Sequence, residues 1–415
     1  FQAIQGTSMS SPQVAGILAL LDQAHPSWSP AAVKSAIMTT ADTAVRDNDR
    51  LSPATPFSMG AGLVDPGHAA NEGSAFQPGL VYDADIFDYL GFLCDTAPEL
   101  TFEDPASSCA FLAGNAVPTD AYNFNSPSIG IANLPGSRTV RRVLSSVAEV
   151  AGEQRYQAFV KAPPGYEIAV EPQSFTIEQG AQIMFELTAT NVDAPIGEWR
   201  FGSLTWSGSD GAGGFYQVTS PIALQAGLID FPAHVSESGA ESSGSFEVDF
   251  GFSGDYSISA HGLVPAAVTR DSVPQDPDQE FSPIDGFSKV YTYDLTGAAY
   301  FRVVLPPDGV DHEDIDLDLY LFDPARRLFD LSGKASTDEE IVVENPQAGT
   351  WTLFVHGYDT VGPTADFTMY DWTIPEQPGG SLVVDAVPEA VLATSGAVEY
   401  SWSALGDDWS MGTFS

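Results

Sequence analysis

The chain of 415 residues is long enough for several domains of roughly 100 to 200 residues each, which excludes a single small binding module. It carries 15 basic and 56 acidic residues, so its formal net charge is −41. Nucleic acid and anionic membrane surfaces are therefore disfavoured as partners, because both require basic patches. The acids are spread through sequence that is 43% hydrophobic, which indicates a folded, acid-coated protein. The longest apolar run, Ala15 to Leu21, is too short to span a bilayer.

The first third of the chain has helical periodicity. From Ser8, apolar residues recur at the i, i+3, i+4 and i+7 spacing of a buried helix, and the run ends at His25. A second helix is expected to begin with Ser29 as N-cap and Pro30 as its first residue. The aromatic-rich stretch 78–94 is interpreted as a short helical connector.

From about Ser128 the apolar pattern changes to a period of two, which is typical of strands. Short alternating runs separated by Pro and Gly continue to Gln225 and predict a sandwich of about seven strands. The Ser- and Gly-rich segment 237–245 is interpreted as a linker or long loop. Strands then resume, pause through the acidic segment 270–286 and return as a second β domain. The final stretch, 381–415, is strand-like and too short to fold alone.

Chemistry is concentrated in one short motif, residues 6–16. Ser8 is expected at a helix N-terminus, where backbone N–H groups and the helix dipole favour developing negative charge. A serine hydroxyl becomes a strong nucleophile when a base takes its proton, and Gly6 lets the backbone approach a substrate closely. The GxSxG nucleophile elbow does not fit, because Ser10 stands where its second glycine is required. The alternative is an ordinary serine N-cap on a buried helix.

The motif GTSMSSPQVAG (6–16) resembles the serine motif of the subtilases, the subtilisin-like serine endopeptidases. The similarity continues through residues 29–41 and through GAGLVDP (60–66). The stretches PGLVYD (78–83) and DYLGFLC (88–94) resemble the cucumisin-like branch, in which a fibronectin type III-like domain follows the protease domain.

The resemblance implies a multidomain protein of the α/β plus all-β class: the C-terminal portion of a subtilisin-like α/β domain, a fibronectin type III-like β-sandwich and a further β-sandwich domain. Residues 314–374 are similar to the pre-peptidase-type C-terminal domains of secreted bacterial proteases. The expected domains are the subtilase portion with its connector (1–115), the fibronectin type III-like sandwich (120–227), the pre-peptidase-type β domain (228–380) and a strand-like C-terminal piece (381–415).

The same resemblance implies serine endopeptidase activity on protein or peptide substrates, through an acyl-enzyme on Ser8, in an extracellular protein. Gly6 and Thr7 are implied to contact the substrate. The family's triad runs Asp, His, Ser along the chain, so we expect the Asp, the His and the oxyanion Asn to lie outside this chain, which would be inactive alone. His261, which precedes a glycine far downstream, is interpreted as structural. The alternative function is an inactive fragment whose β domains act as adhesion or substrate-binding modules.

Cys94 and Cys109 are interpreted, in view of the extracellular resemblance, as a disulfide closing a loop of about 15 residues, with two buried thiols as the alternative. Serine chemistry requires no cofactor. Asp314, Asp316 and Asp318 mimic the first ligands of an EF-hand, but the loop lacks the required glycine and glutamate, so we assign no metal site. We interpret these aspartates as a solvated acidic face and retain a bound calcium ion as the alternative.

Overall fold

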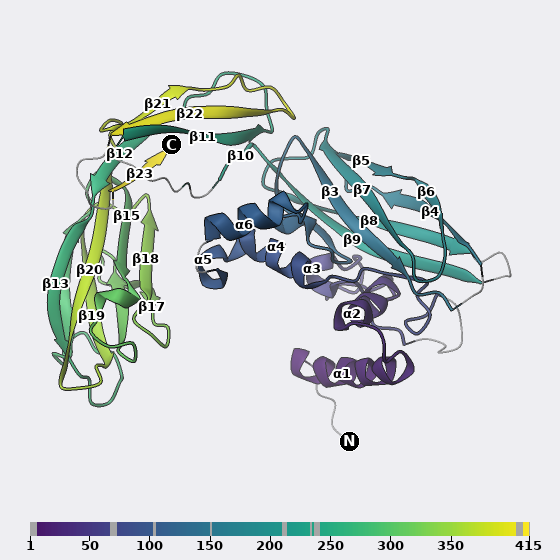
Figure 1. Cartoon of the computed structure of the whole chain (residues 1–415), viewed down its shortest axis with the longest axis horizontal. Coiled ribbons are helices and arrows are strands. Elements are labelled where there is room, and N and C mark those ends of the chain that lie inside the picture. Colours follow the sequence, from purple (N-terminus) through teal and green to yellow (C-terminus); the bar gives the residue numbers. More distant parts are fainter. Residues whose placement is uncertain are drawn as a thin grey trace. The chain divides into compact units, whose positions relative to one another are not determined.

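The structure is a computed structural model of the chain, and it describes residues 6–66, 73–102, 105–149, 152–209, 214–232, 235, 241–403 and 410–414. The chain divides into two compact units. The first comprises Phe1–Asp230 with the short segments Asp249–Gly254 and Ala390–Ser395, and the second comprises the remainder. Figure 1 labels most of their helices and strands.

All α-helices of the described residues belong to the first unit. They are α1 (Thr7–Ala24), α2 (Pro30–Thr39), α3 (Pro56–Met59), α4 (Ile86–Thr96), α5 (Pro98–Thr101) and α6 (Pro105–Gly114), followed by a 3-10 turn, η1 (Ala121–Asn123). Helix α2 begins as its sequence predicts, because the Ser29 side chain accepts a hydrogen bond from the Ala32 amide at 3.0 Å and Pro30 is the first helical residue. Helix α1 ends at His25, as expected.

The connector before α4 is a strand followed by a helix, so the prediction of a helical connector is only partly right. Strand β1 (Leu80–Val81) pairs with the following sandwich, and the hydroxyl groups of Tyr82 and Ser220 lie 2.8 Å apart in its core. Asp85 then starts α4 with a capping box completed by Asp88. The prediction is wrong at Leu80 and Val81, because a two-residue strand is too short to show a period of two in the sequence.

The rest of the first unit is a β-sandwich whose apolar residues alternate between the core and the solvent. One sheet has the order β1, β3 (Ser137–Ser146), β7 (Gln182–Asn191), β5 (Tyr166–Glu171), and the other has the order β2 (Ile129–Pro135), β9 (Phe215–Gly227), β8 (Trp199–Ser209), β4 (Gln154–Lys161), β6 (Ser174–Ile177). Strands β2 and β9 are parallel, and the other recorded pairs are antiparallel. Trp206, Tyr156 and Phe185 are among the largest fully buried side chains.

The second unit contains another sandwich with its own core, around Phe301 and Trp351. Its sheets have the orders β13 (Ala267–Pro274), β20 (Thr364–Pro375), β15 (Ala298–Leu305), β18 (Glu339–Glu344) and β14 (Ser288–Asp294), β19 (Thr350–Asp359), β16 (Asp316–Phe322), β17 (Leu328–Ser332). A short 3-10 turn, η2 (Pro307–Gly309), precedes β16. Strand β13 runs to Pro274, so the pause expected over 270–286 begins five residues too early.

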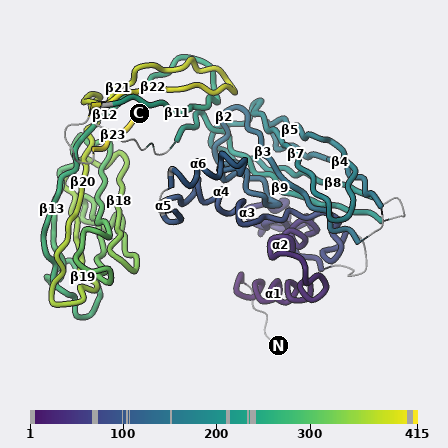
Figure 2. The backbone as a smooth tube through the Cα atoms, viewed as in Figure 1, coloured from purple at the N-terminus to yellow at the C-terminus, as the bar shows by residue number. Residues whose placement is uncertain are grey.

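A further sheet joins distant parts of the chain. Its order is β10 (Ile229–Asp230), β11 (Glu241–Phe250), β22 (Ser395–Ser403), β21 (Leu382–Ala386), and a separate ribbon pairs β12 (Ala260–Pro265) with β23 (Ser410–Phe414). Figure 2 shows β21 and β22 running beside β11. The prediction of a linker over 237–245 is therefore wrong from residue 241 onward. Residues 241–245 belong to β11, because pairing with neighbouring strands decides the structure of this Ser-rich stretch. Residues 237–240 lie outside the described part.

Candidate active site

Ser8 lies in the first turn of α1 and is exposed. The helix starts immediately after Gly6, whose carbonyl oxygen accepts hydrogen bonds from the amides of Met9 and Ser10 at 3.0 and 3.2 Å. The Ser8 hydroxyl has no hydrogen-bond partner among the residues that the structure describes. Ser8 is thus presented at the positive end of a helix, the position that the sequence predicts and that favours an oxyanion.

Gly6 and Thr7 flank the nucleophile candidate. Gly6 has φ 146°, a conformation that side chains with a Cβ rarely adopt, so glycine is required where the chain enters α1. Thr7 is the first helical residue, and both residues are exposed. The two residues are therefore accessible beside Ser8.

Helix α1 has an interruption and a largely uncovered surface. Pro12 lies inside it and has no amide hydrogen, so the Ser8 carbonyl oxygen lacks the donor that an α-helix ordinarily supplies. Leu21 is its only buried residue, and Leu20 is 55% exposed. Helix α2 and its neighbours therefore leave part of the hydrophobic surface of α1 uncovered.

The histidines that the structure describes are each engaged away from Ser8. His25 Nε2 lies 2.8 Å from the Phe76 carbonyl oxygen, and its ring stacks on Trp28. His261 is 4% exposed, with Nδ1 3.2 Å from the Pro375 carbonyl oxygen. Its burial among strands agrees with the structural role expected from the sequence. Within the described residues, no histidine is hydrogen-bonded to Ser8 as a general base.

The remaining two described histidines lie among the aspartates of the second unit. His312 Nδ1 lies 3.5 Å from exposed Asp314, whereas His356 is fully buried against Asp318. Asp318 is 7% exposed, so the solvated acidic face predicted for this strand is wrong at Asp318. Among the described residues, no three His, Cys, Asp or Glu side chains are placed to hold a metal ion.

Sequence reasoning missed the contact between His356 and Asp276. The two residues are 80 positions apart, and Asp276 stands in the acidic segment that shows no periodic pattern. Neither residue is part of a short motif with a recognised spacing. The only local signal is that His356 falls in an otherwise apolar strand, β19, where an ionisable side chain requires a partner.

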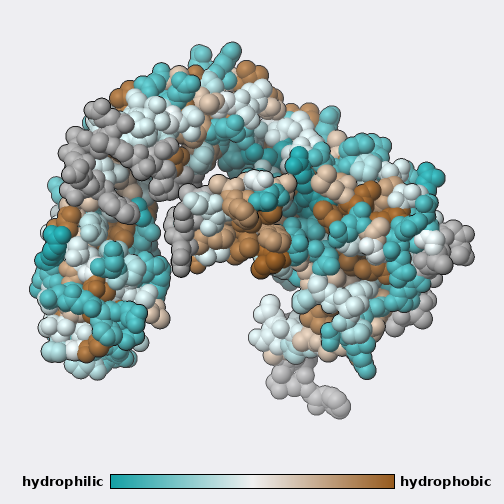
Figure 3. All heavy atoms as spheres, viewed as in Figure 1, coloured by the Kyte–Doolittle hydropathy of each residue, from teal (hydrophilic) through white to brown (hydrophobic). Residues whose placement is uncertain are grey.

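Cys94 in α4 and Cys109 in α6 are joined by a disulfide in the structure, with their Cα atoms 5.7 Å apart. The bond fastens two helices that keep hydrophobic side chains on the surface. Ile86, Phe87 and Phe111 are each more than half exposed, and Figure 3 shows hydrophobic residues gathered over these helices.

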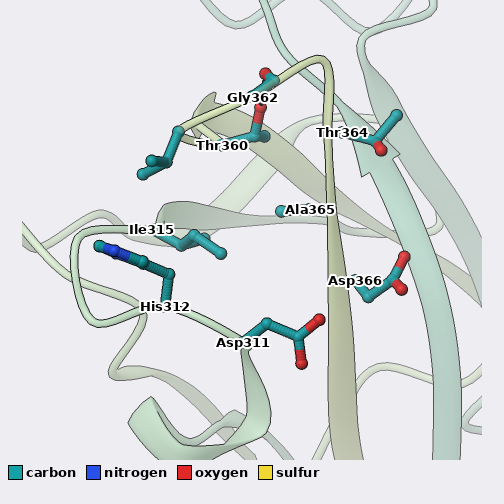
Figure 4. Close-up of a pocket in the computed structure, with 9 residues that line it drawn as sticks. Asp311, His312, Ile315, Thr360, Gly362, Thr364, Ala365 and Asp366 are labelled. Atoms are coloured by element: carbon teal, nitrogen blue, oxygen red, sulfur yellow. Dashed lines mark hydrogen bonds between the residues drawn. The ribbon is translucent and has the colours of Figure 1, made fainter.

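An open pocket of about 310 Å³ lies in the second unit. Figure 4 shows Asp311 and His312 on one side of it and Asp366 on the opposite side, along β20. In this pocket the Thr360 hydroxyl donates to the Gly362 carbonyl oxygen at 2.6 Å. The Thr360 hydroxyl is therefore not activated by a base. With Asp311 and Asp366 in its lining, the pocket is acidic.

Comparison with known proteins agrees with this organisation. The model of the Subtilase family matches residues 1–62, and a Fibronectin type-III domain model matches residues 123–224. The chain therefore carries subtilase sequence followed by a fibronectin type III domain, and the resemblance inferred from its serine motif is confirmed. With these two parts and the C-terminal strands, it is a multidomain protein of the α/β plus all-β class.

Individual relatives are plant proteases. Subtilisin-like protease SBT5.4 of Arabidopsis thaliana is 39% identical over 238 residues, which cover 54% of this chain and 28% of that protein. Subtilisin-like protease SBT2.5 of the same plant is 39% identical over 235 residues, covering 54% and 27%. Its CO(2)-response secreted protease is 34% identical over 238 residues, covering 54% and 29%. The chain thus spans less than a third of the length of these relatives.

Among solved structures, the secreted serine protease VesC from Vibrio cholerae is matched at 10% identity with a TM-score of 0.19, covering 62% of this chain and 50% of that one. A likeness at this level supports no argument about fold or function. Among the described helices, none is both long and apolar enough to cross a membrane.

Proposed function

We propose that this chain is the C-terminal part of a secreted subtilisin-like serine endopeptidase, whose substrates are proteins or peptides. The observation that carries the proposal is the exposed Ser8 at the N-terminus of α1, inside the segment matched by the subtilase family. The names of the relatives, one of which is a secreted protease, support both the activity and the location.

In the proposed reaction, Ser8 Oγ attacks the carbonyl carbon of the scissile peptide bond while a histidine from the upstream part of the protease takes the hydroxyl proton. Negative charge then develops on the substrate oxygen, which the N-terminal amides of α1 and an upstream side-chain amide stabilise. The C–N bond breaks as the histidine returns the proton to the leaving amine. Water subsequently hydrolyses the Ser8 ester, and the hydrolysis requires no cofactor.

The uncovered surface of α1 supports the same proposal. A helix of a globular protein normally buries its apolar stripe, yet Met9 and Leu20 are exposed here and Val14, Ile17 and Leu18 are only partly buried. Upstream sequence of the protease would cover these residues and bring the base to Ser8. We expect the chain alone to lack protease activity for that reason.

The test is casein hydrolysis by the full-length protein and two matched variants. Ser8→Ala should be folded and should lose turnover, down to the residual rate that substrate binding and the oxyanion hole provide. Ser10→Ala removes an equally exposed hydroxyl from the same turn, one that lies 3.4 Å from the Gly6 carbonyl oxygen, and should keep activity within a few-fold. Normal hydrolysis by folded Ser8→Ala would refute the nucleophile assignment, and no hydrolysis by the folded full-length wild type would favour β domains that act as binding modules.

A further inference from the structure

A buried cluster of one histidine and two aspartates lies in the second unit. His356 on β19 is 0% exposed, and its Nε2 lies 2.8 Å from Oδ2 of Asp276, which is 1% exposed. On the other side of the ring, Nδ1 lies 3.3 Å from Oδ2 of Asp318 on β16. Both ring nitrogens therefore face carboxylate oxygens.

This geometry selects one protonation state of His356. A neutral imidazole carries a proton on one nitrogen only, so it would turn a lone pair toward one of the two carboxylates. An imidazolium donates from both nitrogens and supplies the positive charge that two buried carboxylates require. With both aspartates ionised, the cluster is satisfied only when His356 is a cation.

No other cation compensates the cluster among the described residues that pack around it. The groups nearest to it are acidic or phenolic, apart from Lys289 on β14 and Lys334. The Nζ of Lys289 is bonded to Asp271 at 2.8 Å, and that of Lys334 is bonded to Asp338 at 3.3 Å. The acidic and phenolic groups are Asp316 and Tyr320 on β16, Tyr358 and Asp359 on β19, Glu339 on β18 and Asp278 beside Asp276. Loss of the proton from His356 would leave buried carboxylates without a counter-charge.

Asp276 belongs to a segment, residues 275–281, that packs over the β19–β16 face and that we call the strap. Its backbone is fastened where the Asp276 amide donates to the Gly357 carbonyl oxygen at 2.9 Å. Its end is fastened where the Phe281 ring stacks on Tyr320, with centroids 3.8 Å apart. The Asp276–His356 contact lies at the first of these points.

We propose that His356 is a pH-sensitive latch. As a cation, His356 holds the strap on the β19–β16 face, and when His356 loses its proton the strap loosens. Loosening would uncover the Phe281 and Tyr320 rings and give water access to the cluster. The latch is independent of the proposed protease activity, because it involves no residue of the Ser8 site.

The direction of the pH effect follows from the pKa shifts. Burial lowers the pKa of His356, but the hydrogen bonds and charges of Asp318 and Asp276 outweigh burial, so the pKa is raised above its ordinary 6.5. Its stabilising contribution is therefore complete below about pH 6.5 and is lost as the pH rises through the folded-state pKa. The pKa of Asp276 is lowered despite burial, chiefly by the His356 hydrogen bond, so its contribution is lost only in acid. The latch should be tightest between about pH 4 and about pH 6.5.

The test is hydrogen–deuterium exchange of the strap amides in the 415-residue chain, from about pH 5 to about pH 8.5, after correction for intrinsic exchange rates. In the wild type, strap protection should fall with rising pH, by at most about tenfold per pH unit for one released proton. His356→Gln should exchange faster in acid and show a flat profile. The matched control is His312→Gln, which changes a half-exposed histidine beside Asp314 and should keep the wild-type profile.

Imidazole nitrogen NMR of the wild type keeps the proposal testable if His356→Gln does not fold. The signals of His356 should show both nitrogens protonated near pH 6, and Asp276→Asn should move its titration to lower pH, because one carboxylate is lost. A neutral His356 near pH 6 would overturn the proposal, as would a wild-type exchange profile that persists in folded His356→Gln.

Discussion

Asp314, Asp316 and Asp318 show how one stretch of alternating residues acquires three different environments. Strand alternation predicts that they share a face, yet Asp314 is exposed and Asp318 is buried against His356. The pairing of β16 with β19 shifts register between Asp316 and Asp318, which breaks the simple alternation. Asp316 lies between them, and burial together with the charges of Asp318 and Asp359 raises its pKa to about 6.

We predict that Asp316→Asn stabilises the second unit above about pH 6. A carboxyl group whose pKa is raised in the folded state destabilises that state as the pH rises past its unfolded value, about 3.9, toward the folded one. Because Asp316 is only partly buried, the expected gain at pH 8 is on the order of 1 kcal/mol, measured by urea unfolding. Asp314→Asn, which alters a largely exposed neighbour, should change stability by less than about 0.5 kcal/mol. Equal effects of both variants would contradict the assignment.

At the scale of elements, local signals located α1, α2 and part of the connector that holds α4, but they did not locate α3, α5 or α6 and could not pair the strands. The start of α2 could be predicted because Ser29 and Pro30 act within one turn, and the place of Ser8 at a helix N-terminus could be predicted because Gly6 and Ser8 stand in one motif. The pairing of β12 with β23 could not, because it joins segments about 150 residues apart, with no sequence period in common. The cluster at His356 was missed for the same reason.

We predict that removing the disulfide between α4 and α6 lowers the free energy of unfolding. The Cys94→Ser, Cys109→Ser double variant should be less stable by about 3 kcal/mol, since a loop of about 15 residues becomes open in the unfolded state. Thermal unfolding with and without reductant measures this, and the double variant itself should not respond to reductant. Recovery of both cysteines as freely alkylated thiols from protein unfolded without reductant would refute the bond.

A chain ending at Gly380 tests the pairing of the C-terminal strands. Without β21, β22 and β23, strand β11 loses β22 and keeps only the short β10, and β12 loses β23. Buried residues such as Phe246 and Val248 are then exposed. We expect this chain to bind a hydrophobic dye strongly while the sandwich around Phe301 stays folded. Dye binding equal to that of the intact chain would show that residues 381–415 do not complete this part.

At the scale of the whole molecule, charge is the dominant feature. The formal net charge of −41 is spread over both units, and the described ion pairs involve only a minority of the acidic residues. Repulsion among like charges destabilises the compact state. At 0.1 M salt, repulsion between exposed charges more than roughly 10 Å apart is largely screened.

We therefore predict that the melting temperature of the chain holds or rises as sodium chloride is increased to about 1 M. At that concentration the screening length falls to roughly 3 Å, so most of the repulsion is removed. Potassium chloride at the same ionic strength should act alike, because the effect is one of screening and involves no specific ion. A steady fall in melting temperature with either salt would contradict the prediction.

Labelling of Ser8 by a fluorophosphonate probe, located by peptide mass mapping, tests the central claim most directly. In the full-length protein, Ser8 should be labelled rapidly and in preference to Ser10, because the proposed function assigns the upstream base to Ser8. In the 415-residue chain alone, Ser8 should react no faster than other exposed serines. Failure of Ser8 to react in folded full-length protein, or rapid labelling of Ser8 in the isolated chain, would contradict the account.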